Sequence, residues 1–155
     1  MEQRERGTLW LVNIYARAHV RLVPEMLVIF GDNIQEEGMG GQAAQCRGEP
    51  NAFGIPVKWA PARTPNAFFD DSDIMQVGRL ITGKFQDVRD RLLHGKDVAY
   101  PFSGIGTGLA RLESTAPKIM SLVHSGESML KESAKEVLRV NNLSIAWGHK
   151  KVENL

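Results

Sequence analysis

The residues in this sequence that are best suited to chemistry form two glycine-rich turns. The second turn, residues 101–109, reads Pro-Phe-Ser-Gly-Ile-Gly-Thr-Gly-Leu and follows the apolar run 98–100. Because glycine adopts positive φ at little cost and has no side chain, such a turn can direct several backbone N–H groups at one anion. The pattern predicts a phosphate-binding loop, with a plain connection between a strand and a helix as the alternative.

The first glycine-rich turn follows the apolar run 26–30. It begins with Gly31, Asp32 and Asn33, continues through a polar stretch to the glycines of residues 38–41, and leads into residues 42–47, which favour a helix. This order favours anion binding, because free N–H groups and the positive end of a helix dipole converge there. The turn matches neither the Walker pattern, which needs Lys-Ser or Lys-Thr after the glycines, nor the six-residue dinucleotide fingerprint.

Carboxylates in and after the first turn are candidates for a general base. Hydrolysis at an anomeric carbon has an oxocarbenium-like transition state and needs a positioned carboxylate; the candidates are Asp32, Glu36, Glu37 and Glu49. Each has a structural alternative. The pair Asp32-Asn33 is also typical of an Asx turn at a strand end. Glu36 and Glu37 fit a solvated pair of charges, and Glu49 fits an ion pair with Arg47.

Basic and metal-binding side chains give weaker signals. Arg47, Lys58 and Arg63 are candidates for phosphate contact, against the usual role of surface cations in solvation. The four histidines are scattered without ligand spacing, and Cys46 is the only cysteine, so no metal site is predicted. Cys46 is expected to be a small buried hydrophobe.

Strands that alternate with helices must position the two turns. Strands are predicted at residues 9–15, 26–30, 52–57, 97–101 and 143–147, and helices at residues 74–92, 112–123 and 130–140, with a break at Ser125 and Gly126. The alternation indicates the α/β class, with a mixed or largely parallel sheet flanked by helices. Ligands bind beyond the carboxyl ends of such strands, where both turns begin. If the two strands are neighbours, the turns form opposite lips of one cleft.

Composition limits the class of protein. The 155 residues fit one domain, residues 1–155, with residues 1–7 and 149–155 expected to fray. Nineteen basic and 18 acidic residues leave a net charge of +1, which gives no support to broad electrostatic binding of nucleic acid or membrane. A single cysteine and no long apolar stretch favour a cytoplasmic protein.

The two turns, in this order, resemble the two ligand-binding loops of macro domains, which bind ADP-ribose and in some branches hydrolyse ADP-ribosyl bonds. Asn33 and the glycine cluster of residues 38–41 match the spacing of the first loop, and residues 99–101 and 106–109 follow the second, which cradles the diphosphate. The chain departs from the family in two places. No early Gly-Asp pair stands before Asp32, and Gln-Glu-Glu, residues 35–37, precedes the glycines, whereas it follows them in the poly-ADP-ribose glycohydrolase branch.

The resemblance implies a single macro-like domain that binds ADP-ribose or a related NAD-derived nucleotide without a cofactor or a metal. Backbone N–H groups of residues 104–108 would hold the phosphates, and Asn33 would bind ribose hydroxyls. Candidate catalytic residues are Asp32, Asn33 and Glu49. Candidate ligand-binding residues are Gly31, Gly38, Gly40, Gly41, Gln42, Arg47, Ser103, Gly104, Ile105, Gly106, Thr107, Gly108 and Leu109.

The chain also resembles a family of short, mostly uncharacterised proteins common in bacteriophages, through residues 30–33, 38–43, 47–52, 54–56 and 104–110. That likeness implies a phage origin and a location in the host cytoplasm. The expected partner is a nucleotide such as ADP-ribose, or an ADP-ribosylated macromolecule, and no membrane; the oligomeric state is left open. Two alternatives stand beside ADP-ribosyl hydrolysis: a non-catalytic protein that binds a host protein or another nucleotide, and a hydrolase of nucleoside or nucleotide N-glycosidic bonds.

Overall fold

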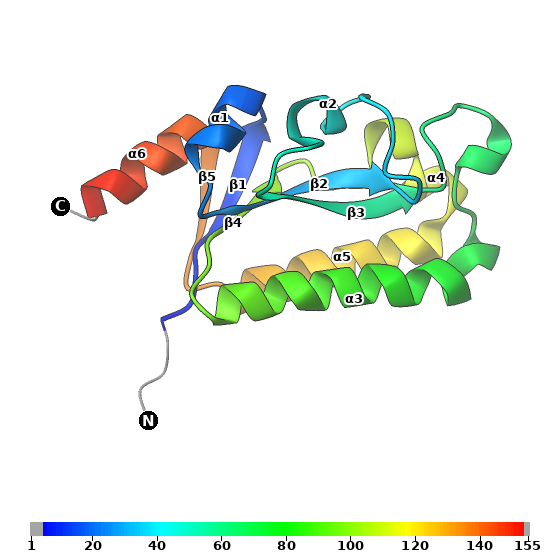
Figure 1. Cartoon of the computed structure of the whole chain (residues 1–155). Helices are drawn as coiled ribbons and strands as arrows, with labels where there is room; N and C mark the ends of the chain where they lie inside the picture. Colours follow the sequence, from blue (N-terminus) through cyan, green and yellow to red (C-terminus); the bar gives the residue numbers. More distant parts are fainter. Residues whose placement is uncertain (1–4, 154–155) are drawn as a thin grey trace.

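A computed structural model describes residues 5–153, and its centre is a five-stranded sheet (Figure 1). The strands are β1 (Leu9–Ile14), β2 (Leu27–Asn33), β3 (Ala52–Lys58), β4 (Val98–Pro101) and β5 (Val137–Asn142). They lie in the order β3-β2-β4-β1-β5, and every neighbouring pair is parallel. The predicted α/β class, with a sheet flanked by helices, is confirmed, and the sheet is parallel throughout.

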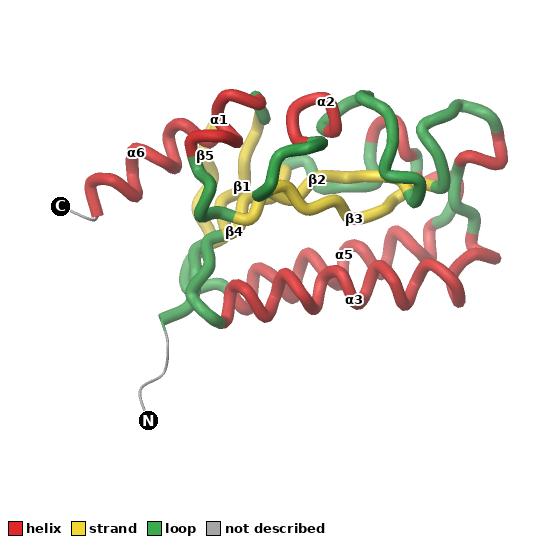
Figure 2. The backbone as a smooth tube through the Cα atoms, viewed as in Figure 1, coloured by secondary structure: helices red, strands yellow, loops and turns green. Residues whose placement is uncertain are grey.

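Helices cover both faces of the sheet. In Figure 1, α3 and α5 lie side by side under one face, and α1, α2 and α6 lie on the other; Figure 2 separates the helices from the long loops that join them. The α-helices are α1 (Arg17–Leu22), α2 (Ala43–Cys46), α3 (Ile74–Leu93), α4 (Leu112–Thr115), α5 (Pro117–Ser133) and α6 (Leu143–Glu153). Single 3-10 turns are η1 (Pro65–Ala67), η2 (Asp71–Asp73) and η3 (Gly108–Ala110).

Two apolar cores follow from this layering, one on each side of the sheet. Strand β2 contributes to both, because its apolar run is buried on both faces. Helix α3 buries one stripe of side chains against the sheet and α5, as its three- and four-residue spacing predicts; the stripe consists of Val77, Ile81, Phe85, Val88 and Leu92. The cores hold the carboxyl end of β2 in a fixed place.

Two predictions near the C-terminus are wrong. Residues 137–142 form strand β5 and not the end of a helix, and residues 143–147 begin helix α6 and do not form a strand. The side chain of Asn142 starts α6, because its Oδ1 accepts hydrogen bonds from the backbone N–H groups of Ser144 at 3.0 Å and Ile145 at 3.3 Å. Helix α6 runs to Glu153, past the residue at which fraying was expected; residues 1–4 and 154–155 lie outside the described part.

The break predicted at Ser125 and Gly126 is also wrong, since α5 continues through both residues. Gly126 faces Phe85 of α3 so closely that a Cβ atom would lie 2.4 Å from the Cγ atom of the ring. Glycine is therefore used here for a close helix contact and not as a helix end.

Within residues 5–153, the helices are all too short or too polar to cross a bilayer.

We expect the change Gly126→Ala to lower the free energy of unfolding by about 1–3 kcal/mol, because the added methyl group overpacks the contact with Phe85. Gly83→Ala is the matched control. Gly83 lies on the exposed side of α3, where a Cβ atom meets nothing within 4 Å, and alanine there should raise stability by up to about 1 kcal/mol. Urea denaturation measures both; equal effects of the two changes would contradict the close packing.

Candidate functional site

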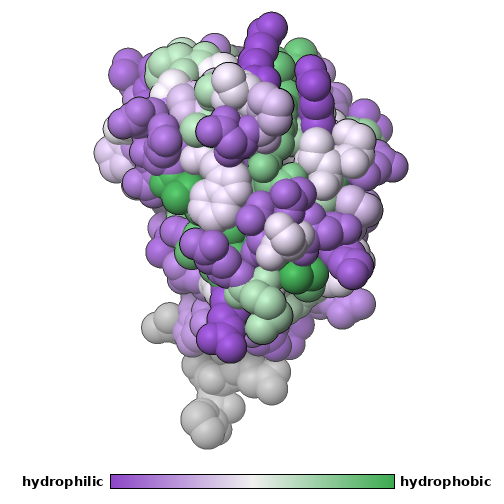
Figure 3. Space-filling view, turned by 90° about the vertical axis from the view of Figure 1, so that its right-hand side faces the viewer, coloured by the Kyte–Doolittle hydropathy of each residue, from purple (hydrophilic) through white to green (hydrophobic). Residues whose placement is uncertain are grey.

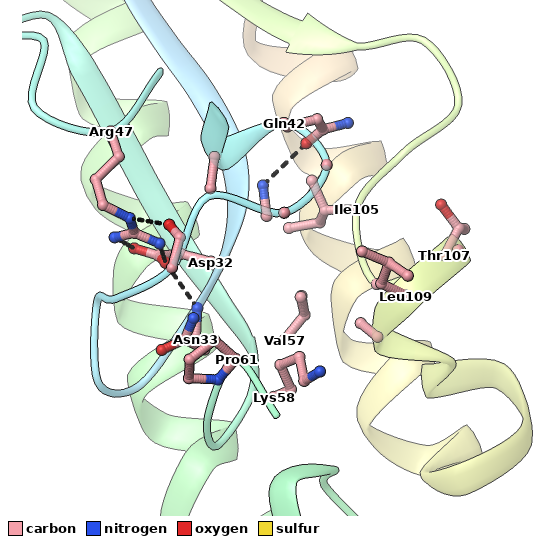
Figure 4. A pocket seen from close by; sticks show the side chains of 18 of the residues that line it. Asp32, Asn33, Gln42, Arg47, Val57, Lys58, Pro61, Ile105, Thr107 and Leu109 are labelled. Atoms are coloured by element: carbon pink, nitrogen blue, oxygen red, sulfur yellow. Dashed lines mark hydrogen bonds and ion pairs between the residues drawn. The ribbon is translucent and has the colours of Figure 1, made fainter. Parts of the chain in front are cut away.

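The carboxyl ends of β2 and β3 and the loop that follows β4 line one cleft of about 320 Å³. Residues 34–42, called the first loop, form one lip, and residues 102–110, called the second loop, form the other (Figure 4). Val57, at the end of β3, and Ile105, from the second loop, both line the cleft. The two glycine-rich turns therefore lie opposite each other, as expected for turns that follow neighbouring strands, and the volume is in the range of small-molecule pockets.

Most of the residues predicted for the site line this cleft. They are Gly31, Asp32, Asn33, Gly38, Gly40, Gly41, Gln42, Arg47, Gly104, Ile105, Gly106, Thr107, Gly108 and Leu109. Glu49 and Ser103 do not line it.

The second loop has the backbone conformation that its glycines suggest. Gly104, Gly106 and Gly108 have φ values of 83°, 81° and 59°, in the left-handed region. The backbone N–H groups of residues 105–109 donate no hydrogen bond to any other group of residues 5–153. Ile105 and Gly106 are buried, where unpaired backbone donors are costly, and the run of free N–H groups that continues from them along the cleft is suited to an anion.

The first loop has the same property on the opposite lip. Gly38 and Gly41 have φ values of 89° and 57°, and a Cβ atom on Gly38 would lie 2.7 Å from the Cβ atom of Pro61. The N–H groups of residues 38–42 also have no acceptor among the described residues. A ligand in the cleft would thus meet backbone donors from both sides.

Asp32 and Arg47 fix the shape of the first loop. The guanidinium group contacts both carboxylate oxygens, at 2.5 Å and 3.3 Å, and also donates to the carbonyl oxygens of Gly38 at 2.8 Å and Glu37 at 3.2 Å. Oδ1 of Asp32 accepts a further bond, at 2.8 Å, from the N–H group of Asn33. Both oxygens of Asp32 are therefore occupied, which leaves Asp32 poorly placed to remove a proton from water.

Asn33 and Gln42 also use their side chains to hold the backbone. Nδ2 of Asn33 donates to the carbonyl oxygen of Glu37 at 2.8 Å, inside the first loop. Oε1 of Gln42 accepts from the N–H group of Gly31 at 3.0 Å, which ties the first loop to β2 (Figure 4). These contacts favour the structural alternative for Asp32 and Asn33, a turn stabilised by side chains at the end of a strand.

Glu49 lies at the other end of β3, away from the cleft, and the catalytic role predicted for it does not fit its position. It forms ion pairs with Arg17 at 2.6 Å and Arg21 at 2.9 Å, and not with Arg47. Hydrogen bonds from Arg21 and Arg17 lower the pKa of the Glu49 carboxyl. The short distance in sequence between Glu49 and Arg47 is misleading, because Arg47 pairs with Asp32 whereas Glu49 pairs with the two arginines of α1.

Ser103 lies in a smaller pocket between β1, β4 and α5, together with Tyr100 and Glu127. The hydroxyl group of Tyr100 donates to Oε2 of Glu127 at 2.5 Å, and burial raises the pKa of Tyr100 well above its ordinary value. Gly104 lies between this pocket and the cleft, since it lines both. Tyr100 and Glu127 thus lie beside Gly104 of the second loop, in the smaller pocket and outside the cleft.

Four lining residues were not predicted: Ala43, Val57, Pro61 and Ala110. Val57 and Pro61 come from the end of β3 and the loop after it, and the rule that ligands bind beyond the carboxyl ends of parallel strands is the signal that could have found them. Lys58, a predicted phosphate contact, also lines the cleft.

Metal and thiol chemistry find no support in the described residues. No group of three or more His, Cys, Asp or Glu side chains in residues 5–153 is placed to hold a metal ion. Burial raises the pKa of the Cys46 thiol to about 12, so this side chain stays protonated and packs as a hydrophobe.

Comparison with known proteins gives a family but no activity. A family model described as "Family of unknown function (DUF7831)" matches residues 11–125, a range that contains both loops and the Asp32–Arg47 pair. No curated protein and no solved structure matches the chain.

We expect the change Arg47→Met to lower the free energy of unfolding by about 3 kcal/mol, because it leaves the buried carboxylate of Asp32 without its cation. The control is the double variant Asp32→Asn with Arg47→Met, which removes the stranded charge and should recover part of the loss. Urea denaturation of the two single variants and the double variant gives the coupling energy. Additive losses would contradict a direct Asp32–Arg47 interaction.

Proposed function

The chain belongs to DUF7831, a family of unknown function, and we propose that it is a macro-like protein that binds ADP-ribose or a related NAD-derived nucleotide between its two loops. The observation that carries the proposal is the run of backbone N–H groups at residues 105–109, which have no acceptor among the described residues and lie in a cleft. A diphosphate presents several charged acceptor oxygens within a few ångströms, and N–H groups bind charged oxygens strongly.

The first loop supports a ligand larger than a phosphate alone. Its glycines line the same cleft as the second loop, so an elongated ligand could contact both lips. Met39 and Leu109 are more than half exposed, with Leu109 on the second loop and Met39 on the first. Of the two, Leu109 lines the cleft, and its exposed apolar side chain suits the ring of a nucleotide. Figure 3 shows the side of the molecule toward which β2 and β3 point, where apolar patches lie among hydrophilic side chains.

Hydrolysis is a separate part of the proposal. The geometry favours a general base other than Asp32 or Glu49. Both oxygens of Asp32 are occupied by Arg47 and the backbone, and Glu49 is outside the cleft. The exposed side chain of Glu37 lines the cleft and its oxygens have no hydrogen-bond partner among the described residues. We therefore assign the role of base in any hydrolysis to Glu37.

We expect saturable heat when the protein is titrated with ADP-ribose up to about 1 mM, equivalent to roughly −4 kcal/mol or better. Gly40→Asp should weaken binding by about tenfold or more, because a Cβ atom there lies 3.4 Å from Leu109 across the cleft, and the new carboxylate repels the diphosphate. Gly83→Asp makes the same chemical change on exposed α3 and should leave the affinity unchanged.

The outcome separates the proposal from its alternatives. No heat with ADP-ribose and no thermal shift at millimolar ligand would refute it. A response to other nucleotides but not to ADP-ribose would favour a different nucleotide, and a folded protein without any response would favour binding to a host protein. The phage origin and the cytoplasmic location stay predictions.

The hydrolytic part has its own test. Glu37→Gln should abolish release of ADP-ribose from ADP-ribosylated protein, while ADP-ribose affinity stays within about threefold, because an amide keeps the size of the side chain and removes the base. Glu36→Gln is the control, since Glu36 does not line the cleft. Unchanged turnover in Glu37→Gln would refute the assignment, and release of free base from a nucleoside panel would identify an N-glycosidic hydrolase instead.

A further inference from the structure

Lys58, Arg63 and Arg111 have no carboxylate partner among the described residues. Lys58 ends β3 and lines the cleft, Arg111 directly follows the second loop, and Arg63 lies in the long connection between β3 and α3. None of the three forms an ion pair within residues 5–153. Arg47, in contrast, is neutralised in the same cleft by Asp32. The positive charge at the β3 end of the cleft is therefore uncompensated.

Two of these cations are held on one aromatic ring. Nζ of Lys58 lies 4.5 Å from the centroid of the Phe68 ring, and the guanidinium carbon of Arg111 lies 5.5 Å from the same centroid. Nζ of Lys58 also donates a hydrogen bond to the carbonyl oxygen of Ala62 at 2.8 Å. These contacts gather both side chains beside the cleft before any ligand binds, which reduces the entropy that binding would cost.

The cations repel one another. Burial lowers the pKa of Lys58, and the charges of Arg111 and then Arg63 lower it further. The shared contact with Phe68 likewise holds Lys58 and Arg111 close together. An anion among them would relieve the repulsion and gain hydrogen bonds from charged donors.

The backbone of Arg111 is itself unusual. Its φ is 52°, in the left-handed region that a side chain other than glycine rarely adopts, and it stands where η3 ends and α4 begins. Such a conformation persists where the surroundings fix it. It sets the direction in which the Arg111 side chain leaves the second loop, toward Phe68 and Lys58.

We propose that Lys58 and Arg111 form a second anion subsite that binds a phosphate group carried by the nucleotide in addition to its diphosphate. The inference rests on the proposed function, which assigns the diphosphate to the second loop. The ligand class is then a phosphorylated ADP-ribose. Two adjacent cations suit the double negative charge of a phosphate monoester better than the single charge of a carboxylate.

Calorimetry at low ionic strength tests the subsite in two arms. In the first, protein saturated with ADP-ribose is titrated with inorganic phosphate, which should still bind because the second subsite remains empty. In the second, 2′-phospho-ADP-ribose is compared with ADP-ribose and should bind about tenfold more tightly, the gain typical of a hydrogen bond between charged groups. The first arm detects the subsite with free phosphate, whatever the position of the phosphate on the natural ligand. The second arm tests whether a phosphate at the 2′ position of ADP-ribose reaches the subsite.

Two variants test the residues. Lys58→Met keeps the apolar stem over Phe68, and Arg111→Asn keeps a residue type that tolerates left-handed φ. Each should abolish phosphate binding, and Arg111→Asn should in addition leave the affinity for ADP-ribose within about twofold, because Arg111 does not line the cleft. Lys84→Met is the matched control: Lys84 lies 5.1 Å from the Phe53 ring, on α3, and its loss should change nothing.

Each outcome bears on one of the two proposals. ADP-ribose binding without phosphate binding in either arm refutes the second subsite and leaves the proposed function in place. Phosphate binding that survives Lys58→Met and Arg111→Asn refutes it as well. If ADP-ribose does not bind, the proposed function fails; phosphate binding that is lost in Lys58→Met but kept in Lys84→Met then still supports the anion subsite, and its absence refutes that too.

Discussion

The cleft depends on the way β2 pairs with its two neighbours. β2 pairs with β3 from Val28 to Asn33, but with β4 only at Leu27 and Val28. Beyond Val28, the second loop takes the place of a strand beside β2, and a Cβ atom on Gly31 would lie 3.6 Å from the Cβ atom of Ile105. The pairing of β4 with β2 therefore ends after two residues, and the second loop lies beside the rest of β2. A strand in that place would have used its N–H groups in hydrogen bonds to β2, whereas those of the loop stay free.

In the Asp32–Arg47 pair, side chains that were candidates for catalysis and ligand binding fix the shape of the first loop. A carboxylate at the end of a buried strand needs a cation, and Arg47 supplies it while binding the carbonyl oxygens of residues 37 and 38. The pair holds the glycines of the first loop open toward the second. The same contacts occupy both carboxylate oxygens of Asp32, which is then not free to act as a base. The first loop therefore supports a binding role more strongly than a hydrolytic one.

Local patterns were enough to predict the parts of the structure that are locally determined. The continuous apolar run of β2, the stripe of α3 and the alternation of elements led to the α/β class, and the glycines marked both loops. Partners distant in sequence could not be predicted: Glu49 contacts Arg17 and Arg21 because α1 packs nearby, and Gly126 serves a contact with Phe85. Residues 137–142 have apolar spacing that fits either a helix or an edge strand, and pairing with β1 decides it.

The cleft offers two kinds of hydrogen-bond donor, which lie in different parts of it. The loops offer neutral N–H groups whose positions are set by glycine backbone, while Lys58 and Arg111 offer full charges from side chains at one end. With a net charge of +1, the protein has little long-range attraction for anions, so any selectivity for them is local. Salt screens exposed charges more than hydrogen bonds in a cleft, and the two kinds of donor therefore differ in how their contributions depend on ionic strength.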